Sequence, residues 1–165
     1  MALIHEKLYR SNNLARIRFD EYIKELTLFL MRTYKDTAQQ VKLDIQAEAV
    51  NLDIDTAIPC GLMINELVSN SLKHGFPAAE HSSAARAGRI CIRLVLLSDH
   101  AIKLTIEDNG VGFPEDMEVR KTDTLGLQLV ISLTRQLGGT VTFKTNHGAQ
   151  TEINFISESA YVDEN

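Results

Sequence analysis

The residues of this chain whose types and spacing could do chemistry are Glu66, Asn70 and Lys73. If residues 58–75 are helical, a rotation of about 100° per residue puts these three side chains within an arc of roughly 60°. An amide oxygen suits a hard cation such as Mg2+, which takes one or two side chains together with substrate phosphates. A carboxylate one turn away can orient or deprotonate a nucleophile, and a lysine offers positive charge to phosphate oxygens. Taken alone, the same pattern is also that of an ordinary solvated helix face.

A second candidate is the run Asp108-Asn-Gly-Val-Gly112. Residues 102–107 alternate apolar and polar side chains, which predicts a half-buried strand with Asp108 at its end. A carboxylate there can accept a hydrogen bond from an amine, while Gly110 and Gly112 leave room for a flat ring and permit positive φ angles. Adenine has both an amine and a flat ring. The same letters are also a common tight turn between strands.

The third candidate is the run Thr124-Leu125-Gly126-Leu127, at the start of an apolar periodic segment. The period predicts a helix that begins near Leu125 and ends at residues 138–139, where two glycines follow one another. Its first turn has unpaired N–H groups and the positive end of the helix dipole, and Gly126 allows close approach, so phosphates suit this position. A helix simply capped by Thr124 is the alternative.

The elements that must position these runs follow from hydrophobic periodicity. Residues 19–34 carry apolar side chains at helical spacing, Phe29 among them, and residues 58–75 have an apolar stripe opposite Glu66, so both segments are expected to be helices with one buried face. Strands are predicted at residues 41–45, 51–54, 90–97, 102–107, 140–144 and 151–156. Residues 77–88 lack periodicity and indicate a surface loop. Helices on one face of a mixed sheet make a two-layer α/β sandwich of the α+β kind.

The order and spacing of the three runs resemble the ATP-binding catalytic domain of sensor histidine kinases, in the superfamily of gyrase B, Hsp90 and MutL. Residues 65–74 look like that family's N box, residues 108–112 its first glycine box and residues 124–127 its second. Residues 148–151, although poorer in glycine, are similar to the closing segment, in which a threonine, here Thr151, helps hold adenine. The amino-acid sequences of the N box and of the first nine residues resemble those of the HWE-related branch. The resemblance implies a Bergerat-type ATP-binding fold.

The resemblance also implies a role for each matching residue. Glu66 would be the catalytic base, Asn70 the Mg2+ ligand, Lys73 and His74 neighbours of the phosphates, and Asp108 the adenine reader. The implied activity is transfer of the γ-phosphate of Mg·ATP to a histidine, in two-component signalling. The alternatives are a serine kinase of the anti-sigma type, which shares the nucleotide site, and a nucleotide-sensing or dimerisation module without transfer activity.

On the same resemblance, residues 1–18 would end the dimerisation and phosphoacceptor hairpin, residues 19–157 would be the catalytic domain and residues 158–165 a C-terminal tail. In these families the phosphorylated histidine lies in the first hairpin helix, upstream of the matching segment, so His5 is not assigned that role. The expected partners are ATP, a separate phosphoacceptor histidine domain and a response regulator, with a homodimer in the full-length protein.

Residues 113–123 form the candidate lid over the phosphates. Few of their side chains are apolar, so the segment is predicted to order only when nucleotide binds. Arg120 or Lys121 could then reach the γ-phosphate, although a charge run of this kind is also typical of a solvated surface.

Composition agrees with a domain of this class. The chain has 165 residues, enough to bury a core, and its net charge of −5 argues against non-specific nucleic-acid binding. No run approaches the ~18 apolar residues of a membrane span and no signal peptide opens the chain. A cytoplasmic location without direct membrane contact is therefore expected, although the full-length protein could carry an anchor. Cys60 and Cys91 lack metal-ligand spacing and are expected to be reduced core residues.

Overall fold

The computed structural model describes residues 16–77, 87–97, 100–113 and 125–162. Its helices are α2 (Phe19–Thr33), α3 (Lys35–Ala38), α4 (Ile54–Asn70), the π-helical turn η1 (Ser71–Gly75) and α5 (Leu125–Gln136). Its strands are β1 (Ile17–Arg18), β2 (Val41–Ala47), β3 (Val50–Leu52), β4 (Gly88–Leu96), β5 (Ala101–Asp108), β6 (Thr140–Thr145), β7 (Ala149–Ile156) and β8 (Tyr161–Val162). None of the described helices combines the length and apolar character needed to cross a membrane.

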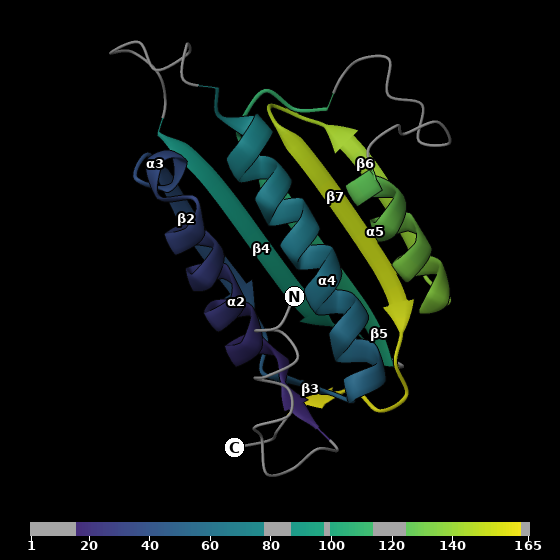
Figure 1. Cartoon of the computed structure of the whole chain (residues 1–165). Helices are drawn as coiled ribbons and strands as arrows, with labels where there is room; N and C mark the ends of the chain where they lie inside the picture. Colours follow the sequence, from purple (N-terminus) through teal and green to yellow (C-terminus); the bar gives the residue numbers. More distant parts are fainter. Residues whose placement is uncertain (1–15, 78–86, 98–99, 114–124, 163–165) are drawn as a thin grey trace.

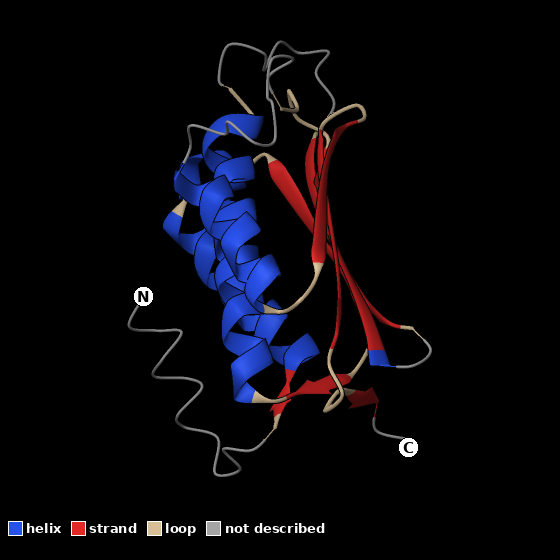
Figure 2. Ribbon diagram, turned by 90° about the vertical axis from the view of Figure 1, so that its right-hand side faces the viewer, coloured by secondary structure: helices blue, strands red, loops and turns tan. Residues whose placement is uncertain are grey.

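The larger sheet has five strands in the order β2-β4-β5-β7-β6. Strand β2 is parallel to β4, and the other neighbours are antiparallel. Helices α2, α4 and α5 lie side by side over this sheet (Figure 1), and the edge-on view shows all three on the same side of it (Figure 2). The predicted two-layer sandwich, with helices on one face of a mixed sheet, is confirmed.

Alternation along the strands divides the sheet into an inner and an outer face. The inner face points to the helices and is apolar, with fully or nearly fully buried side chains at Ile90, Ile92, Leu94, Leu104, Ile106 and Ile153. The outer face carries charge pairs, including Arg93 Nη2 to Glu107 Oε2 at 2.6 Å and Lys103 Nζ to Glu152 Oε2 at 2.9 Å. One face is therefore core and the other is polar, as expected for a largely antiparallel sheet with a single covered face.

Helix α4 fills the centre of the helical layer. Its predicted apolar stripe is confirmed, since Ile64, Leu67 and Val68 are 0–4% exposed. The helix begins at Ile54, earlier than expected, and the prediction of a strand up to residue 54 is wrong. The cause is Asp53, whose carboxylate accepts a hydrogen bond from the Thr56 N–H at 2.8 Å and caps the first turn.

Helix α2 packs beside α4 through Phe19, Ile23 and Leu30, which are 0–3% exposed. Phe29 was expected on this buried face but is 42% exposed, so that expectation is wrong. The buried stripe follows the i, i+4 and i+7 positions from Phe19 to Leu30, and Phe29 lies about 100° away from Leu30 around the helix.

A second sheet has three strands in the order β1-β3-β8. It lies at the end of the fold where helix α4 begins. Strand β1 lies within the segment expected to end the hairpin, and β8 within the expected tail. Both pair antiparallel with β3. Just before β8, Ala160 is 1% exposed and belongs to the core, so the described residues on both flanks are joined to the domain.

Candidate functional site

Three elements converge at the end of the large sheet where β5 ends: the last turn of α4 with η1, the loop after β5, and the first turn of α5. The Ser71 hydroxyl donates to Asp108 Oδ2 at 2.6 Å and so joins η1 to β5. The Val111 N–H donates to the Gly75 carbonyl at 3.0 Å and ties the following loop to the same turn. The residues that the sequence singled out far apart in the chain thus lie around one place.

Asp108 is the most constrained side chain in this region. It is 8% exposed, and its Oδ1 accepts the N–H of Gly110 at 2.9 Å and that of Ala149 at 3.1 Å. Its Oδ2 accepts the Ser71 hydroxyl. A carboxylate offers about four lone-pair positions, so this arrangement fixes the group with three donors and leaves capacity for a further one.

Two glycines make this close packing possible. A Cβ added at Gly110 would lie 2.1 Å from the Gly75 carbonyl oxygen. A Cβ added at Gly148, whose φ is +142°, would lie 1.9 Å from the Asp108 carbonyl oxygen. No other residue fits either position without moving the backbone, so the glycines are needed for contact between chain segments as well as for any bound ring.

Gly112, in the loop after β5, and Thr151, on β7, belong to the same region as Asp108. The sequence allowed positive φ at Gly110 and Gly112; Gly112 has a φ of +80°, whereas Gly110 is not among the described residues with positive φ. Thr151 is 2% exposed and pairs with Ile106 across the β5–β7 ladder, on the inner face. Asp108 and Thr151 are therefore on the helix side of neighbouring strands.

The helix that carries Glu66 and Asn70 meets the start of α5 at Gly126. A Cβ added at Gly126 would lie 2.8 Å from Glu66 Oε2 and 3.5 Å from Asn70 Nδ2. Both side chains are half-buried, and the Asn65 side-chain amide donates to Glu66 Oε1 at 3.3 Å. The carboxylate and the amide therefore share one face of α4, directly against the glycine of α5.

The flanking positions of this α5 run differ in burial. Leu127 is 6% exposed and belongs to the core, whereas Leu125 is 83% exposed. Thr124 lies outside the described residues, as do the predicted lid residues Arg120 and Lys121. The helix ends as predicted, with Gly138 at a φ of +65° and the Gly139 N–H bonded to the Thr134 carbonyl at 2.9 Å.

Lys73 and His74 lie in η1 and are both exposed. The Lys73 Nζ is 5.6 Å from the centre of the Tyr34 ring, at the end of α2. The expected arc of Glu66, Asn70 and Lys73 assumed α-helical rotation up to residue 75, which is wrong, because the α-helix ends at Asn70 and a wider π-turn follows. Lys73 therefore faces α2 in this structure.

Sequence reasoning missed Ser71 and the Ala149 N–H as partners of Asp108. Ser71 is 37 positions from Asp108, and no spacing rule pairs a helix residue with a strand end at that separation. One signal was present, since Ser71 directly follows Asn70, a residue of the candidate helix face.

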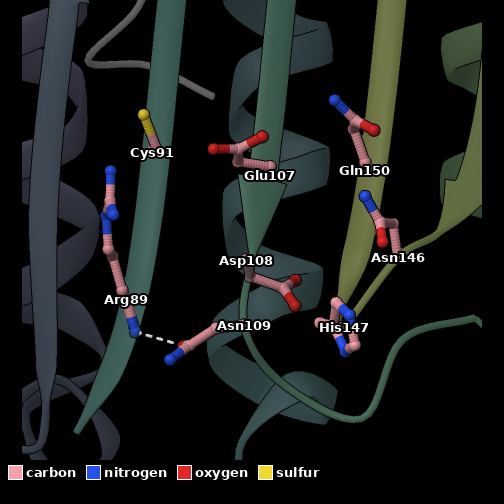
Figure 3. Close-up of a pocket in the computed structure, with 8 residues that line it drawn as sticks. All are labelled: Arg89, Cys91, Glu107, Asp108, Asn109, Asn146, His147 and Gln150. Atoms are coloured by element: carbon pink, nitrogen blue, oxygen red, sulfur yellow. Dashed lines mark hydrogen bonds between the residues drawn. The ribbon is translucent and has the colours of Figure 1, made fainter.

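A separate pocket of about 270 Å³ lies on the outer face of the sheet, beside the same strand end. Figure 3 shows its lining residues, which are Arg89, Cys91, Glu107, Asp108, Asn109, Asn146, His147 and Gln150. Asn109 Oδ1 accepts the Arg89 backbone N–H at 2.5 Å, and Arg93 lies over Cys91 with Nη1 at 3.5 Å from Sγ. Cys91 is thus buried on the outer face instead of in the core, while Cys60 is a core residue as predicted. Asp108 stands at the boundary between the two faces.

Comparison with known families agrees with this geometry. Residues 56–159 match the family described as histidine kinase-, DNA gyrase B- and HSP90-like ATPase. Residues 1–34 match a second family described as histidine kinase. The first match begins in the first turn of α4 and ends just before β8, so it includes every described residue of the site.

Curated relatives and solved structures point the same way. The chain is 31% identical over 114 residues to blue-light-activated histidine kinase 2 of Erythrobacter litoralis and 30% identical over 135 residues to the sensor histidine kinase PdtaS of Mycobacterium tuberculosis. These alignments cover 69% and 81% of this chain but only 31% and 25% of the two relatives.

Among solved structures, the histidine kinase domain of a blue-light-activated histidine kinase of Erythrobacter litoralis superposes with a TM-score of 0.73 at 25% identity, over 85% of this chain and 61% of that one. The arrangement of Asp108, Gly126 and the α4 face is thus found in a chain that belongs to the histidine kinase-, DNA gyrase B- and HSP90-like ATPase family.

Proposed function

We propose that this chain binds Mg·ATP and transfers its γ-phosphate to a histidine of a phosphoacceptor domain, as the catalytic domain of a sensor histidine kinase in two-component signalling. The observation that carries the proposal is the convergence of Asp108, Gly126 and the Glu66–Asn70 face at one end of the sheet. Such an arrangement suits a ligand with an amine at one end and phosphates at the other. Similarity to two curated histidine kinases supports the same function.

Asp108 is the residue that we assign to the adenine amine. Its three protein donors hold the carboxylate in one orientation and leave one acceptor position. Thr151 is buried on the adjacent strand and is assigned to the same end of the nucleotide. The first turn of α5, with its unpaired N–H groups and Gly126, is assigned to the phosphates.

The residues present fit a magnesium ion. Asn70 and Glu66 place side-chain oxygens on one helix face, and Gly126 leaves beside both the space that a Cβ would fill. In our proposal Asn70 would hold Mg2+, together with phosphate oxygens and water. Bound there, the ion would neutralise the negative charge that accumulates on the transferring phosphate.

Glu66 is the proposed catalytic residue. A phosphorus–oxygen bond to the β-phosphate breaks and a phosphorus–nitrogen bond to the incoming imidazole forms, while the other ring nitrogen gives up its proton. Glu66 would accept the hydrogen bond from that N–H, orient the ring and take up the proton as the phosphorus–nitrogen bond forms. Imidazole needs little activation near neutral pH, because its ordinary pKa of about 6.5 leaves it mostly unprotonated on the attacking nitrogen.

The complete pathway lies beyond this chain, which spans a third or less of the two curated relatives. We propose a phosphoacceptor histidine domain and a response regulator as partners, a homodimer in the full-length protein and a cytoplasmic location. Contacts of Lys73, His74, Arg120 or Lys121 with phosphates remain predictions.

The test is transfer of radiolabelled γ-phosphate from Mg·ATP to a phosphoacceptor histidine domain supplied by a related kinase. We expect acid-labile phosphate on that domain with the unmodified chain, and a rate at least about 100-fold lower with Glu66→Gln, because general-base catalysis contributes about that much. ATP affinity should be nearly unchanged in this variant. Glu152→Gln, an equal change on the outer face of the same sheet, should transfer at the unmodified rate.

Other outcomes would redirect the proposal. Acid-stable phosphate on a partner would indicate a serine kinase. Tight ATP binding without transfer to any supplied domain would indicate a nucleotide-sensing module.

A further inference from the structure

Asp108 has one side-chain donor among the described residues, and it is Ser71. The other two donors are backbone N–H groups, and both of them bond to Oδ1. Oδ2 is held by the Ser71 hydroxyl alone, at 2.6 Å. The orientation of the carboxylate about its own axis therefore depends on a single side chain at that oxygen.

The position of Ser71 follows from the end of helix α4. The α-helix stops at Asn70, and Ser71 is the first residue of η1. Ser71 and Asp108 are each 8% exposed, so bulk water competes little for their bond. A charge-assisted bond of this length in such a place is stronger than one between neutral groups.

Gly75 leaves space beside Oδ2 that a side chain would otherwise fill. A Cβ added at Gly75 would come within 3.5 Å of Oδ2, in van der Waals contact with it. With Oδ1 bonded twice, the remaining acceptor capacity of the group lies on Oδ2. An incoming amine would share this oxygen with the Ser71 hydroxyl.

We propose that Ser71 is a positioning residue that sets the preference for 6-aminopurines over 6-oxopurines, an inference that rests on the proposed nucleotide site at Asp108. Its hydroxyl donates to one lone pair of Oδ2 and directs the other toward the exocyclic amine of adenine. A 6-oxopurine presents an oxygen at that place, and two acceptors face each other without a proton between them. Without the hydroxyl, the carboxylate can turn and share its lone pairs with water, so the selective contact weakens.

The experiment is a calorimetric titration of the chain with ADP and with inosine diphosphate, which differ at the 6-position of the base. The variants are Ser71→Ala, Ser71→Thr, and Ser69→Ala as matched control, because Ser69 is a buried serine two positions earlier, in α4, that is not among the described donors to Asp108. We expect the unmodified chain to prefer ADP. Ser71→Ala should bind ADP about tenfold more weakly, the typical effect of losing a bond to a charged group, with inosine diphosphate affinity unchanged.

Ser71→Thr, which keeps the hydroxyl, should restore most of the preference, and Ser69→Ala should not alter it. Equal loss of both nucleotides in Ser71→Ala would show a merely structural serine and overturn the inference, as would unchanged ADP affinity. If Ser71→Ala fails to fold by circular dichroism, Ser71→Cys, a weaker donor of similar size, must show a reduced preference for the inference to stand. An unmodified chain that binds neither nucleotide would refute the proposed function itself.

Discussion

An aspartate lies at each end of helix α4, and each accepts hydrogen bonds from a serine hydroxyl and from at least one backbone N–H. At the start, Asp53 accepts the Thr56 N–H at 2.8 Å and the Ser159 hydroxyl at 2.5 Å. At the other end, Asp108 accepts the Ser71 hydroxyl and the N–H groups of Gly110 and Ala149. The two carboxylates are chemically alike and have opposite roles in our account.

Their surroundings explain the difference. Asp53 joins the first turn of α4 to the chain just before β8, and the three-stranded sheet covers that end. Asp108 is surrounded by a loop with glycines at positions 110 and 112 and by the glycine turn at 148. Both carboxylates join chain segments, but the glycines beside Asp108 leave space in which a ligand can reach its remaining acceptor position.

The largest effect on stability is expected when a glycine beside Asp108 is replaced. Gly148→Ala places a Cβ 1.9 Å from the Asp108 carbonyl oxygen at a φ of +142°, so we expect the free energy of unfolding to fall by about 3 kcal/mol. Gly138→Ala is the control, since its φ is +65° and nothing lies within 4 Å of the added atom; it should cost only about 1 kcal/mol. Urea unfolding measures both, and equal losses would contradict the claim that Gly148 is required for contact.

A smaller effect is expected when the contacts of Asp53 at the start of α4 are removed. Asp53→Ala deletes the N-cap of α4 and should lower the free energy of unfolding by about 1 kcal/mol. Nucleotide affinity should stay within twofold, because the site lies at the far end of the helix. A tenfold loss of affinity would show that the two ends are coupled through α4.

The charge of Asp53 adds a pH dependence. Burial opposes it, but hydrogen bonds from Ser159 and Thr56 outweigh the burial and lower the pKa of Asp53. The stabilisation is therefore present above the unfolded pKa of about 3.9 and is lost as the pH falls through the lower pKa of the folded state. The stability gap between the unmodified chain and Asp53→Ala, measured by urea unfolding from pH 7 downward, should be constant to about pH 4 and then shrink. A gap that widened in acid would contradict this assignment.

The smallest effect is expected at Lys73. Because its Nζ lies 5.6 Å from the centre of the Tyr34 ring, Lys73→Met should lower stability by about 0.5 kcal/mol, as for an exposed cation–π pair. Lys73→Arg should keep that stability. Calorimetry with Mg·ATP tests the predicted phosphate contact: a tenfold loss of affinity in Lys73→Met would show that Lys73 turns to the phosphates when nucleotide binds, and less than a twofold change would show that it stays beside Tyr34.

Much of the fold could be predicted from periodicity. The β4–β5 and β6–β7 hairpins and the limits of α5 come from local patterns, alternation in the strands and the glycines at residues 138–139. Strands β1 and β8 could not be predicted, because two residues are too few to alternate and they exist only through pairing with β3. The same holds for η1, which depends on contacts of Ser71 and Gly75 with the loop after β5.

In the candidate site, too, features set by local sequence patterns could be predicted and features set by tertiary contacts could not. Glu66, Asn70 and Gly126 could be identified from helix spacing and a glycine position, and the structure brings them together. Two of the three donors that hold Asp108, the Ser71 hydroxyl and the Ala149 N–H, could not, since they are 37 and 41 positions away in the chain. Residue types and their spacing indicate a site, but the hydrogen-bond partners of its residues are set by tertiary packing.

The most direct test of the account is calorimetric titration with Mg·ATP of the unmodified chain, of Asp108→Asn and of Asp53→Asn. The same change is made at both ends of α4, and asparagine caps a helix about as well as aspartate. We predict binding that Asp108→Asn weakens at least about 100-fold, because an amide mismatches the donors and the amine, while Asp53→Asn binds normally. Unchanged affinity in a folded Asp108→Asn chain would contradict the central claim that this carboxylate reads the nucleotide.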